Sequence, residues 1–167
     1  MNAVGADSSQ GRTSGDDSEA LRRRHIADFE AIVPESIGRI EWSADRVKDE
    51  RRRALRKLLA LAVERSPWHR ERLAAIDLSG LSEADIASLP VMTKTDLMDN
   101  FDDVVTDRRL TRELCERHLD AATDDKYLLG EYHVVASGGS SGQRGVFVYG
   151  WDAWAICWAS MVRFASR

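Results

Sequence analysis

The stretch of sequence that decides the fold reads Tyr132-His133-Val134-Val135-Ala136, then Ser137-Gly138-Gly139-Ser140-Ser141-Gly142-Gln143-Arg144-Gly145, then Val146-Phe147-Val148-Tyr149. The first and third parts are short and rich in β-branched and aromatic residues, which favours strands. The middle part consists mostly of Gly and Ser, which is typical of a loop. We therefore expect two strands joined by a loop.

This loop has the composition of an anion-binding site. Glycine allows positive φ angles and a close approach of the backbone to a ligand. Backbone N–H groups that cluster in such a loop bind phosphate, and serine hydroxyl groups add further donors. The simpler interpretation is a flexible Gly/Ser turn of a hairpin, and composition alone leaves both interpretations open.

The spacing of the glycines excludes two common phosphate-binding loops. A Walker loop has Gly, four residues, and then Gly-Lys followed by Ser or Thr, whereas Gln143 stands where the second Gly would follow Gly138. A dinucleotide-binding loop has Gly-x-Gly-x-x-Gly at the start of a helix. Here Gly139, Gly142 and Gly145 follow a different spacing and precede a strand-like run. A phosphate-binding role would therefore belong to another class of loop.

The loop resembles the phosphate-binding motif of the AMP-forming acyl-CoA ligases, which belong to the adenylate-forming superfamily, and is most similar to their phenylacetate–coenzyme A ligase branch. That motif typically reads Ser-Ser-Gly-Thr-Thr-Gly-Lys-Pro-Thr. Ser137, Gly139 and Gly142 match it, and Ser140 and Ser141 keep the hydroxyl groups of its two threonines.

The loop also departs from that motif. Gly138 replaces its second serine, and Gln143 and Arg144 replace its Lys-Pro pair. Any role that depends on the family's lysine is therefore in doubt for this chain. Arg144 supplies a positive charge one position later, and a guanidinium group suits phosphate as well as an ammonium group does.

Two earlier segments extend the resemblance. Residues 66–73, Ser-Pro-Trp-His-Arg-Glu-Arg-Leu, are similar to the family's Pro-aromatic-Tyr-Arg segment. Residues 89–97, Leu-Pro-Val-Met-Thr-Lys-Thr-Asp-Leu, resemble its Leu-Pro-x-x-Thr-Lys-x-Asp-Leu segment. Tyr149 and Asp152 stand where the family has an aromatic residue and an acid that open a helix. The segments follow the family's order, and the resemblance covers roughly residues 43–167.

The resemblance implies the N-terminal part of an acid–thiol ligase. Such an enzyme uses ATP and Mg²⁺ to convert a small-molecule carboxylic acid into an acyl-adenylate, and then transfers the acyl group to coenzyme A. The acid, which can be an aryl acetate, a benzoate-like, a fatty or an amino acid, stays open, as does the acceptor thiol. The family permits a homodimer. No residue is a convincing catalytic base or nucleophile. The expected contacts to the ATP phosphates are Ser137, Gly138, Gly139, Ser140, Ser141, Gly142 and Arg144.

The resemblance also implies a domain organisation, within a family whose complete fold is α/β. We expect residues 1–17 to form a disordered tail and residues 18–125 a mainly helical N-terminal region. Residues 126–167 would be the start of the large adenylate-forming domain, with its first strands, the phosphate loop 137–145 and a helix. In the family the adenine, ribose and acyl sites and the small C-terminal domain come later. We therefore expect the chain alone to be catalytically inactive.

Composition restricts the class of protein further. The chain has 167 residues, of which 43% are hydrophobic and 31% charged, and this suits a domain with its own core. A net charge of −4 predicts no general attraction to nucleic acid or to an anionic membrane. No run of about 18 apolar residues predicts a membrane span. Cys115 and Cys157 predict reduced thiols in a cytoplasmic protein, and their spacing indicates no metal site.

Apolar spacing predicts a first group of helices. Residues 21–33 repeat apolar side chains at near-helical intervals, and Pro34 should interrupt this helix. Ser43 is a good N-cap for a longer helix. That helix should end before Pro67, because the residue that precedes a proline disfavours helical backbone.

A second group of elements follows Pro67. Leu73, Ile76 and Leu78 predict a short helix that ends in a loop through Gly80. Ser82, followed by acids, should start another helix that stops near Pro90. The remaining expected elements are a capped helix from Thr93, a helix or turn over residues 110–119, and a break at Asp124-Asp125.

A tryptophan-rich helix should follow the second strand. Trp151, Trp154, Ala155, Trp158, Met161 and Val162 recur at helical spacing. Such a stripe usually packs against a sheet, although pockets are also lined in this way. Without the strands that follow in the family, the stripe would stay exposed and favour self-association or insolubility.

Two other functions remain open at the level of sequence. One is a non-catalytic helical interaction module in which the Gly/Ser loop is only a turn. The other is a degenerate family member that lost adenylation together with the Lys-Pro pair. Protection of the loop by ATP or pyrophosphate would argue against the first alternative. Acid-dependent exchange of labelled pyrophosphate into ATP would argue against the second.

Overall fold

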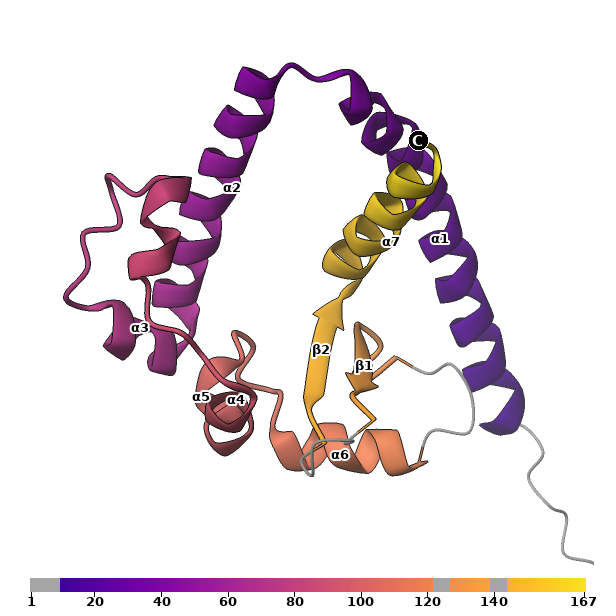
Figure 1. Ribbon diagram of the computed structural model, residues 1–167. Helices are drawn as coiled ribbons and strands as arrows, with labels where there is room; N and C mark the ends of the chain where they lie inside the picture. Colours follow the sequence, from indigo (N-terminus) through magenta and orange to yellow (C-terminus); the bar gives the residue numbers. More distant parts are fainter. Residues whose placement is uncertain (1–9, 122–126, 139–143) are drawn as a thin grey trace, which may run out of the picture. The chain divides into compact units, whose positions relative to one another are not determined.

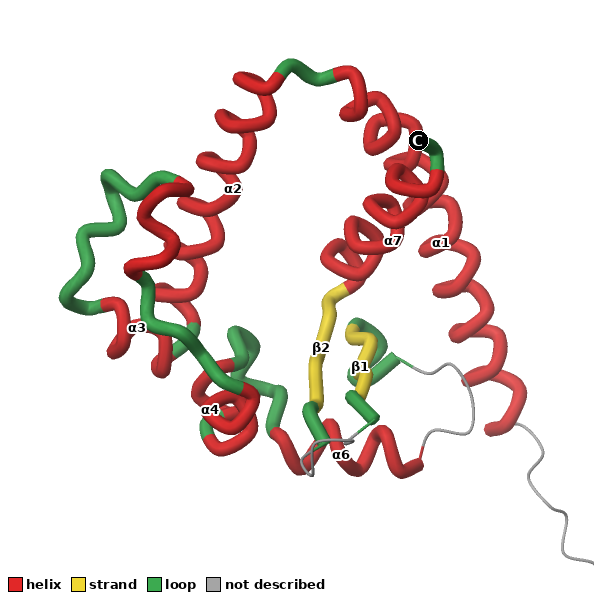
Figure 2. Tube along the Cα trace, viewed as in Figure 1, coloured by secondary structure: helices red, strands yellow, loops and turns green. Residues whose placement is uncertain are grey.

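The computed structural model describes residues 10–121, 127–138 and 144–167, which are mostly helical with one small antiparallel sheet. This agrees with the expected helical region that is followed by a first pair of strands. Figures 1 and 2 show the elements. In chain order they are α1 (Gln10–Gly38), the 3₁₀ helix η1 (Arg39–Glu41), α2 (Ala44–Arg65), α3 (Pro67–Leu73), the 3₁₀ helix η2 (Glu83–Ser88), α4 (Lys94–Asp99), α5 (Phe101–Val104), α6 (Arg112–Ala121), β1 (Tyr132–Ala136), β2 (Val146–Gly150) and α7 (Trp151–Ala165).

The chain divides into two compact units. The first unit combines residues up to Ile40 with residues 149–167, and the second spans Glu41–Val148. The division at residues 17 and 125 that the sequence suggests stays a prediction. The expected break at Asp124-Asp125 lies outside the described residues.

In the first unit, α7 packs along α1. Ala155 and Ala159 of α7 are buried, and the Ser36 hydroxyl of α1 donates a hydrogen bond of 3.0 Å to the backbone oxygen of Ala159. The rings of His25 and Trp151 stack almost parallel, with their centroids 3.9 Å apart. Small residues on α7 permit this close approach, because the distance between two helices depends on the side chains at their contact.

The course of α1 differs from the sequence-based expectation at both ends. Its backbone is already helical from Gln10, inside the stretch predicted to be disordered. It also continues through Pro34 to Gly38, whereas the sequence predicts an interruption at this proline. Once a helix has nucleated, each added residue gains a hydrogen bond. The contact of Ser36 with α7 lies beyond Pro34, so tertiary packing overrides the local preference there.

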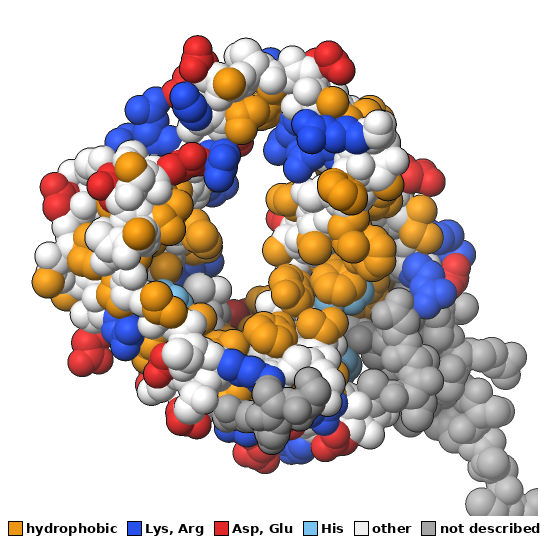
Figure 3. Space-filling view, in the orientation of Figure 1, with side chains coloured by type: hydrophobic (Ala, Val, Ile, Leu, Met, Phe, Trp, Pro, Cys, Tyr) orange, Lys and Arg blue, Asp and Glu red, His pale blue; other side chains and the backbone are white. Residues whose placement is uncertain are grey.

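The tryptophan-rich stripe of α7 is covered only in part. Trp158 and Met161 expose 48% and 57% of their surfaces, and Ile156 and Phe164 are exposed as well. Hydrophobic side chains accordingly gather on the surface over α7 in Figure 3. The exposure of Trp158 and Met161 agrees with the expectation that the stripe stays exposed without the strands that follow in the family, whereas Ala155 of the same stripe is buried. Helix α7 is apolar on nearly all sides, so one packing contact leaves much of its apolar surface uncovered.

The second unit begins with α2 and α3, which lie side by side in Figure 1. The Ser43 hydroxyl accepts a hydrogen bond of 3.3 Å from the Arg46 N–H, and α2 ends at Arg65, as the sequence predicts. Leu59, Leu73 and Leu81 form a buried cluster between α2, α3 and the segment that follows.

Helix α3 lies earlier in the chain than expected. Apolar spacing predicts a helix around residues 73–78, but the helix spans Pro67–Leu73. Proline suits the first turn of a helix, where its missing N–H would have no partner. Ser66 supplies the cap. Ile76 and Leu78 pack against the buried cluster, partly buried, without being helical. Their apolar spacing therefore reflects this packing and not a helix.

Ser66 joins α2, α3 and α5. This side chain is completely buried, and its hydroxyl donates a hydrogen bond of 2.8 Å to the backbone oxygen of Asp103. The Ser66 oxygen accepts from the His69 backbone N–H at 3.3 Å and lies 2.9 Å from His69 Nδ1. Because the hydroxyl proton points to Asp103, Nδ1 must be the protonated ring nitrogen. Burial, helped by Arg72, lowers the pKa of His69 and favours this neutral form.

A second core supports the strand pair. Its members come from α4, α5, α6, β2 and the loops between them, and α6 contacts β1. Met98, Cys115 and Val146 are almost inaccessible to solvent. The sequence-based prediction of a capped helix at Thr93 is confirmed, since Thr93 and Asp96 form a capping box. The other buried members are Phe101, Leu110 and Leu128.

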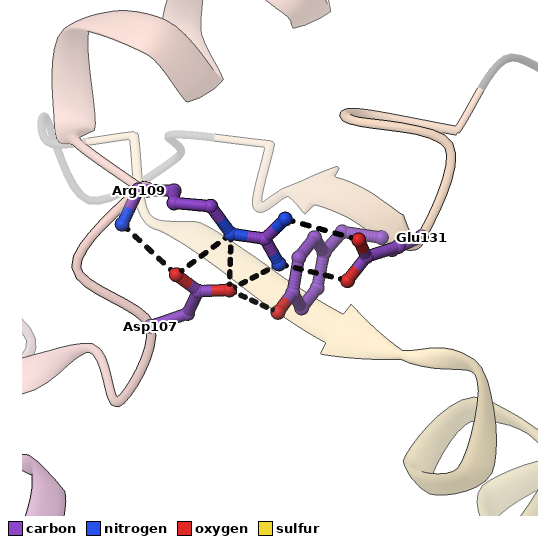
Figure 4. A network of polar contacts seen from close by, with 4 residues as sticks. Asp107, Arg109 and Glu131 are labelled. Atoms are coloured by element: carbon purple, nitrogen blue, oxygen red, sulfur yellow. Dashed lines mark hydrogen bonds and ion pairs between the residues drawn. The ribbon is translucent and has the colours of Figure 1, made fainter.

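A polar network fastens the start of β1 to the turn before α6 (Figure 4). Arg109 binds Glu131 with two parallel hydrogen bonds of 3.0 and 2.8 Å, and its Nε lies 3.1 Å from Asp107 Oδ1. The Tyr132 hydroxyl donates to Asp107 Oδ2 at 2.6 Å. Hydrogen bonds from Arg109 and then Tyr132 hold the pKa of Asp107 well below its usual range.

The helices give no sign of a membrane span. Within residues 10–121, 127–138 and 144–167, no helix combines the length and the apolar character that crossing a bilayer requires.

Replacing Ser66 should destabilise the second unit. Ser66→Ala removes the cap of α3 and the hydrogen bond from this buried side chain to the Asp103 carbonyl, so we expect a loss of about 2 kcal/mol in the free energy of unfolding. Urea denaturation followed by circular dichroism measures this loss. Ser82→Ala is the matched control, because the hydrogen bond of this half-buried N-cap to Asp85 is exposed, and it should lose less than about 1 kcal/mol. Equal losses in the two variants would contradict the central role of Ser66.

The hydrogen bonds of Asp107 should make the free energy of unfolding depend on pH in the acidic range. Because the pKa of Asp107 is lower in the folded than in the unfolded chain, its contribution is fully present above the unfolded pKa, about 4. That contribution disappears as the pH falls further. The difference in urea midpoint between wild type and Asp107→Asn should therefore shrink between about pH 5 and pH 2. Asp99→Asn, an exposed carboxylate without an ion pair to any described residue, serves as the control and should show no such trend.

Candidate phosphate-binding site

The structure describes three of the seven residues that the sequence predicts to bind phosphate. Ser137 and Gly138 follow β1, and Arg144 precedes β2. The other four, Gly139, Ser140, Ser141 and Gly142, lie outside the described residues. The described part of the candidate site is therefore the base of the loop, where the chain leaves β1 and enters β2.

The base of the loop is closed by two hydrogen bonds. The Ser137 N–H donates to the Gly145 oxygen, and the Gly145 N–H donates to Ser137 Oγ, both at 2.9 Å. The predicted hairpin between the two strands is confirmed by this pairing. Because Ser137 Oγ acts as an acceptor in this contact, its own proton remains available for an anion.

Lys94 lies beside the base of the loop. A methyl group placed on Gly145 would come within 3.0 Å of Cε of Lys94 and 3.1 Å of the Phe147 ring. Among the described residues Lys94 has no ion-pair partner. The sequence-based site omits Lys94, although it stands in the family-like segment 89–97. Its place in this segment is the one feature of the sequence that could have indicated Lys94 as a site residue. Only the fold, however, brings Lys94 close to a loop that lies about 50 positions later in the chain.

Arg144 also lies at the base of the loop. Its Nη1 is 3.4 Å from Oδ1 of Asp120, near the end of α6, and both side chains are exposed. The two cations therefore differ, because a carboxylate pairs with Arg144 whereas no carboxylate of the described residues pairs with Lys94.

The three family-like segments contact one another in series. Arg72 of segment 66–73 donates a hydrogen bond of 3.1 Å to the backbone oxygen of Val91 in segment 89–97. The second segment is in turn followed directly by Met98, whose sulfur accepts a hydrogen bond of 3.3 Å from the Val146 N–H at the end of the loop. The first two segments are thus in direct contact, and the residues that directly follow the second and third segments, Met98 and Val146, contact each other.

Two surface depressions in the same unit are lined by other residues. One, of about 490 Å³, lies between α2 and η2 and includes Asp45, Lys48 and Glu83. The other, of about 540 Å³, lies around α5 and includes Asp102 and Arg112. Both carry mixed charges, and neither is lined by Ser137, Gly138 or Arg144. We therefore base the candidate site on the convergence of donors and cations rather than on these depressions.

Metal-binding side chains do not cluster in the described part of the chain. Residues 10–121, 127–138 and 144–167 contain no group of three or more His, Cys, Asp and Glu side chains that could hold a metal ion. Mg²⁺ often binds through substrate phosphates and water rather than through a protein cage.

Comparisons with known proteins found no similar one. No protein-family model, no curated protein and no solved structure matches this chain.

The contact between Gly145 and Lys94 predicts a difference between two glycines of the loop. In Gly145→Ala the new methyl group must displace the Lys94 side chain and the Phe147 ring, so we expect a loss of at least about 1 kcal/mol in unfolding free energy. In Gly138→Ala no atom of the residues that the structure describes lies within 4 Å of the new methyl group. Thermal denaturation should show a change within about 0.5 kcal/mol for this control. A loss in Gly138→Ala as large as that in Gly145→Ala would contradict the packing.

Proposed function

We propose that this chain is the N-terminal part of an AMP-forming acyl-CoA ligase of the phenylacetate–coenzyme A ligase type, and that its loop 137–145 binds the β- and γ-phosphates of ATP. The observation that carries the proposal is the convergence of Ser137, Lys94 and Arg144 on the base of the loop. A donor and two cations beside a Gly/Ser loop suit a phosphate anion.

The contacts between the family-like segments add support. If the resemblance were a coincidence of composition, segments 66–73, 89–97 and 137–145 would have no reason to meet. Arg72 of the first segment contacts Val91 of the second, and Lys94 of the second lies beside Gly145 of the third. This arrangement is also what a structural scaffold for a phosphate loop requires, because the loop's ends must be held rigidly.

The chemistry of such an enzyme takes place in two steps. In the first step a carboxylate oxygen of the acid attacks the α-phosphorus of ATP, the bond to the β-phosphate oxygen breaks, and pyrophosphate leaves. In the second step the coenzyme A thiol loses its proton and attacks the carbonyl carbon of the acyl-adenylate. A thioester then forms, and AMP leaves with the bonding electron pair.

The loop would act in the first step. Negative charge increases on the departing pyrophosphate, and donors that are already oriented stabilise it without reorganisation. Ser137 can donate its hydroxyl proton, and Lys94 and Arg144 can approach as cations. Mg²⁺ bound to ATP would share this charge. No general base is needed here, because a carboxylic acid is already ionised at neutral pH.

The proposal is tested by titrating the chain with inorganic pyrophosphate and with ATP in a calorimeter. Lys94→Ala should weaken pyrophosphate binding about tenfold, since a charged hydrogen bond contributes about 1.5 kcal/mol or more. Ser140→Ala combined with Ser141→Ala should weaken it as well. Lys57→Ala, which removes the same charge from an exposed position of α2, is the control and should bind as wild type does.

The outcome separates the proposed function from its alternatives. Absence of pyrophosphate binding, or equal binding by Lys94→Ala and Lys57→Ala, would favour a helical interaction module in which the loop is only a turn. If the variants behave as expected, acid-dependent exchange of labelled pyrophosphate into ATP by the full-length protein is measured next. Binding without exchange would indicate a degenerate family member.

A further inference from the structure

Asp120 is the one carboxylate in ion-pair contact with Arg144 among the described residues. The pair lies at the base of the loop, on the surface of the second unit. Asp120 does not belong to the family-like segments, and the resemblance assigns it no role. It nevertheless opposes the charge that the loop would offer to phosphate.

We propose that Asp120 sets the phosphate affinity of the base of the loop, at Arg144, by holding the Arg144 guanidinium when no ligand is bound. An incoming phosphate then competes with the Asp120 carboxylate for Arg144. This inference rests on the proposed function, because it concerns the same phosphate ligand. It makes Asp120 a positioning residue that acts through Arg144.

The two partners differ in how firmly they are held. Asp120 lies in the last turn of α6, and this helix is anchored in the core by the buried Cys115 and by Leu119, which packs against the same core. Arg144 has a long side chain, is about half exposed and follows a Gly/Ser-rich loop. The carboxylate is therefore the fixed partner, and the guanidinium is the partner that can turn to a ligand.

The ion pair between Asp120 and Arg144 is weak enough for Arg144 to exchange the carboxylate for a phosphate ligand. Exposed ion pairs contribute little to stability, because water and salt screen them. A contact of 3.4 Å between exposed side chains is thus strong enough to bias Arg144 but weak enough for a multiply charged anion to displace. Lys94, which has no ion-pair partner among the described residues, would attract the anion before this exchange.

The experiment compares pyrophosphate affinities of the full chain by calorimetry near physiological salt. Asp120→Asn should bind pyrophosphate about two- to fivefold more tightly than wild type, the range expected from the strength of an exposed pair. Arg144→Ala should bind more weakly. In the Arg144→Ala background, the further change Asp120→Asn should have no effect. Asp120→Glu, which keeps a carboxylate within reach, should restore an affinity close to that of wild type.

Glu113→Gln provides a matched control. It removes one negative charge from the same helix, roughly 10 Å before Asp120 along the helix axis. This separation exceeds the screening length of about 8 Å at physiological salt. The affinity of Glu113→Gln should therefore equal that of wild type.

The possible results test the role of Asp120 separately from the proposed function. If wild type fails to bind pyrophosphate, both are overturned. If wild type binds and Asp120→Asn binds equally well, only the role of Asp120 is overturned. A gain from Asp120→Asn that persists in the Arg144→Ala background also overturns it, because Asp120 would then act by its charge alone.

Discussion

The contact between Met98 of α4 and Val146 of β2 is the constraint on which the candidate site depends. The exposed fractions of these side chains are 1% and 0%, and the Val146 N–H donates to the Met98 sulfur. Val146 is the first residue of β2, so this contact determines where the loop ends. It places Gly145 beside the start of α4 and therefore beside Lys94. The half-buried Lys94 is thus positioned by a contact in the buried core.

The family-like segments have structural roles that are independent of any catalytic one. Ser66 and Pro67 start α3, and the Ser66 hydroxyl ties this helix to Asp103. Thr93 and Asp96 cap α4 reciprocally. These residues would be needed to build the scaffold even without a ligand. Lys94 and Arg144, which lie beside the base of the loop, are the charged residues there that this scaffold does not use.

The sequence allowed most local elements to be predicted, because their signals are local. Ser43 and Thr93 each start a helix with a capping hydroxyl, and the apolar runs around the Gly/Ser loop form the expected strands. The errors arise where packing overrides a local rule. Helix α1 continues through Pro34, and Ile76 and Leu78 pack against a buried cluster without being helical. Neither outcome can be read from periodicity, because both depend on what the segment contacts.

By itself, the sequence determined the composition of the candidate site: a Gly/Ser loop between two strands, with Ser137 at its start and Arg144 near its end. Hydroxyl groups, glycines and a guanidinium are properties of residues, so they can be read directly. Only the tertiary structure decided which charges surround this loop. Lys94 reaches it through the packing of Met98 on Val146, and Asp120 reaches Arg144 because α6 is anchored beside β1. Electrostatic interactions depend on distance in space, and burial of the core determines those distances.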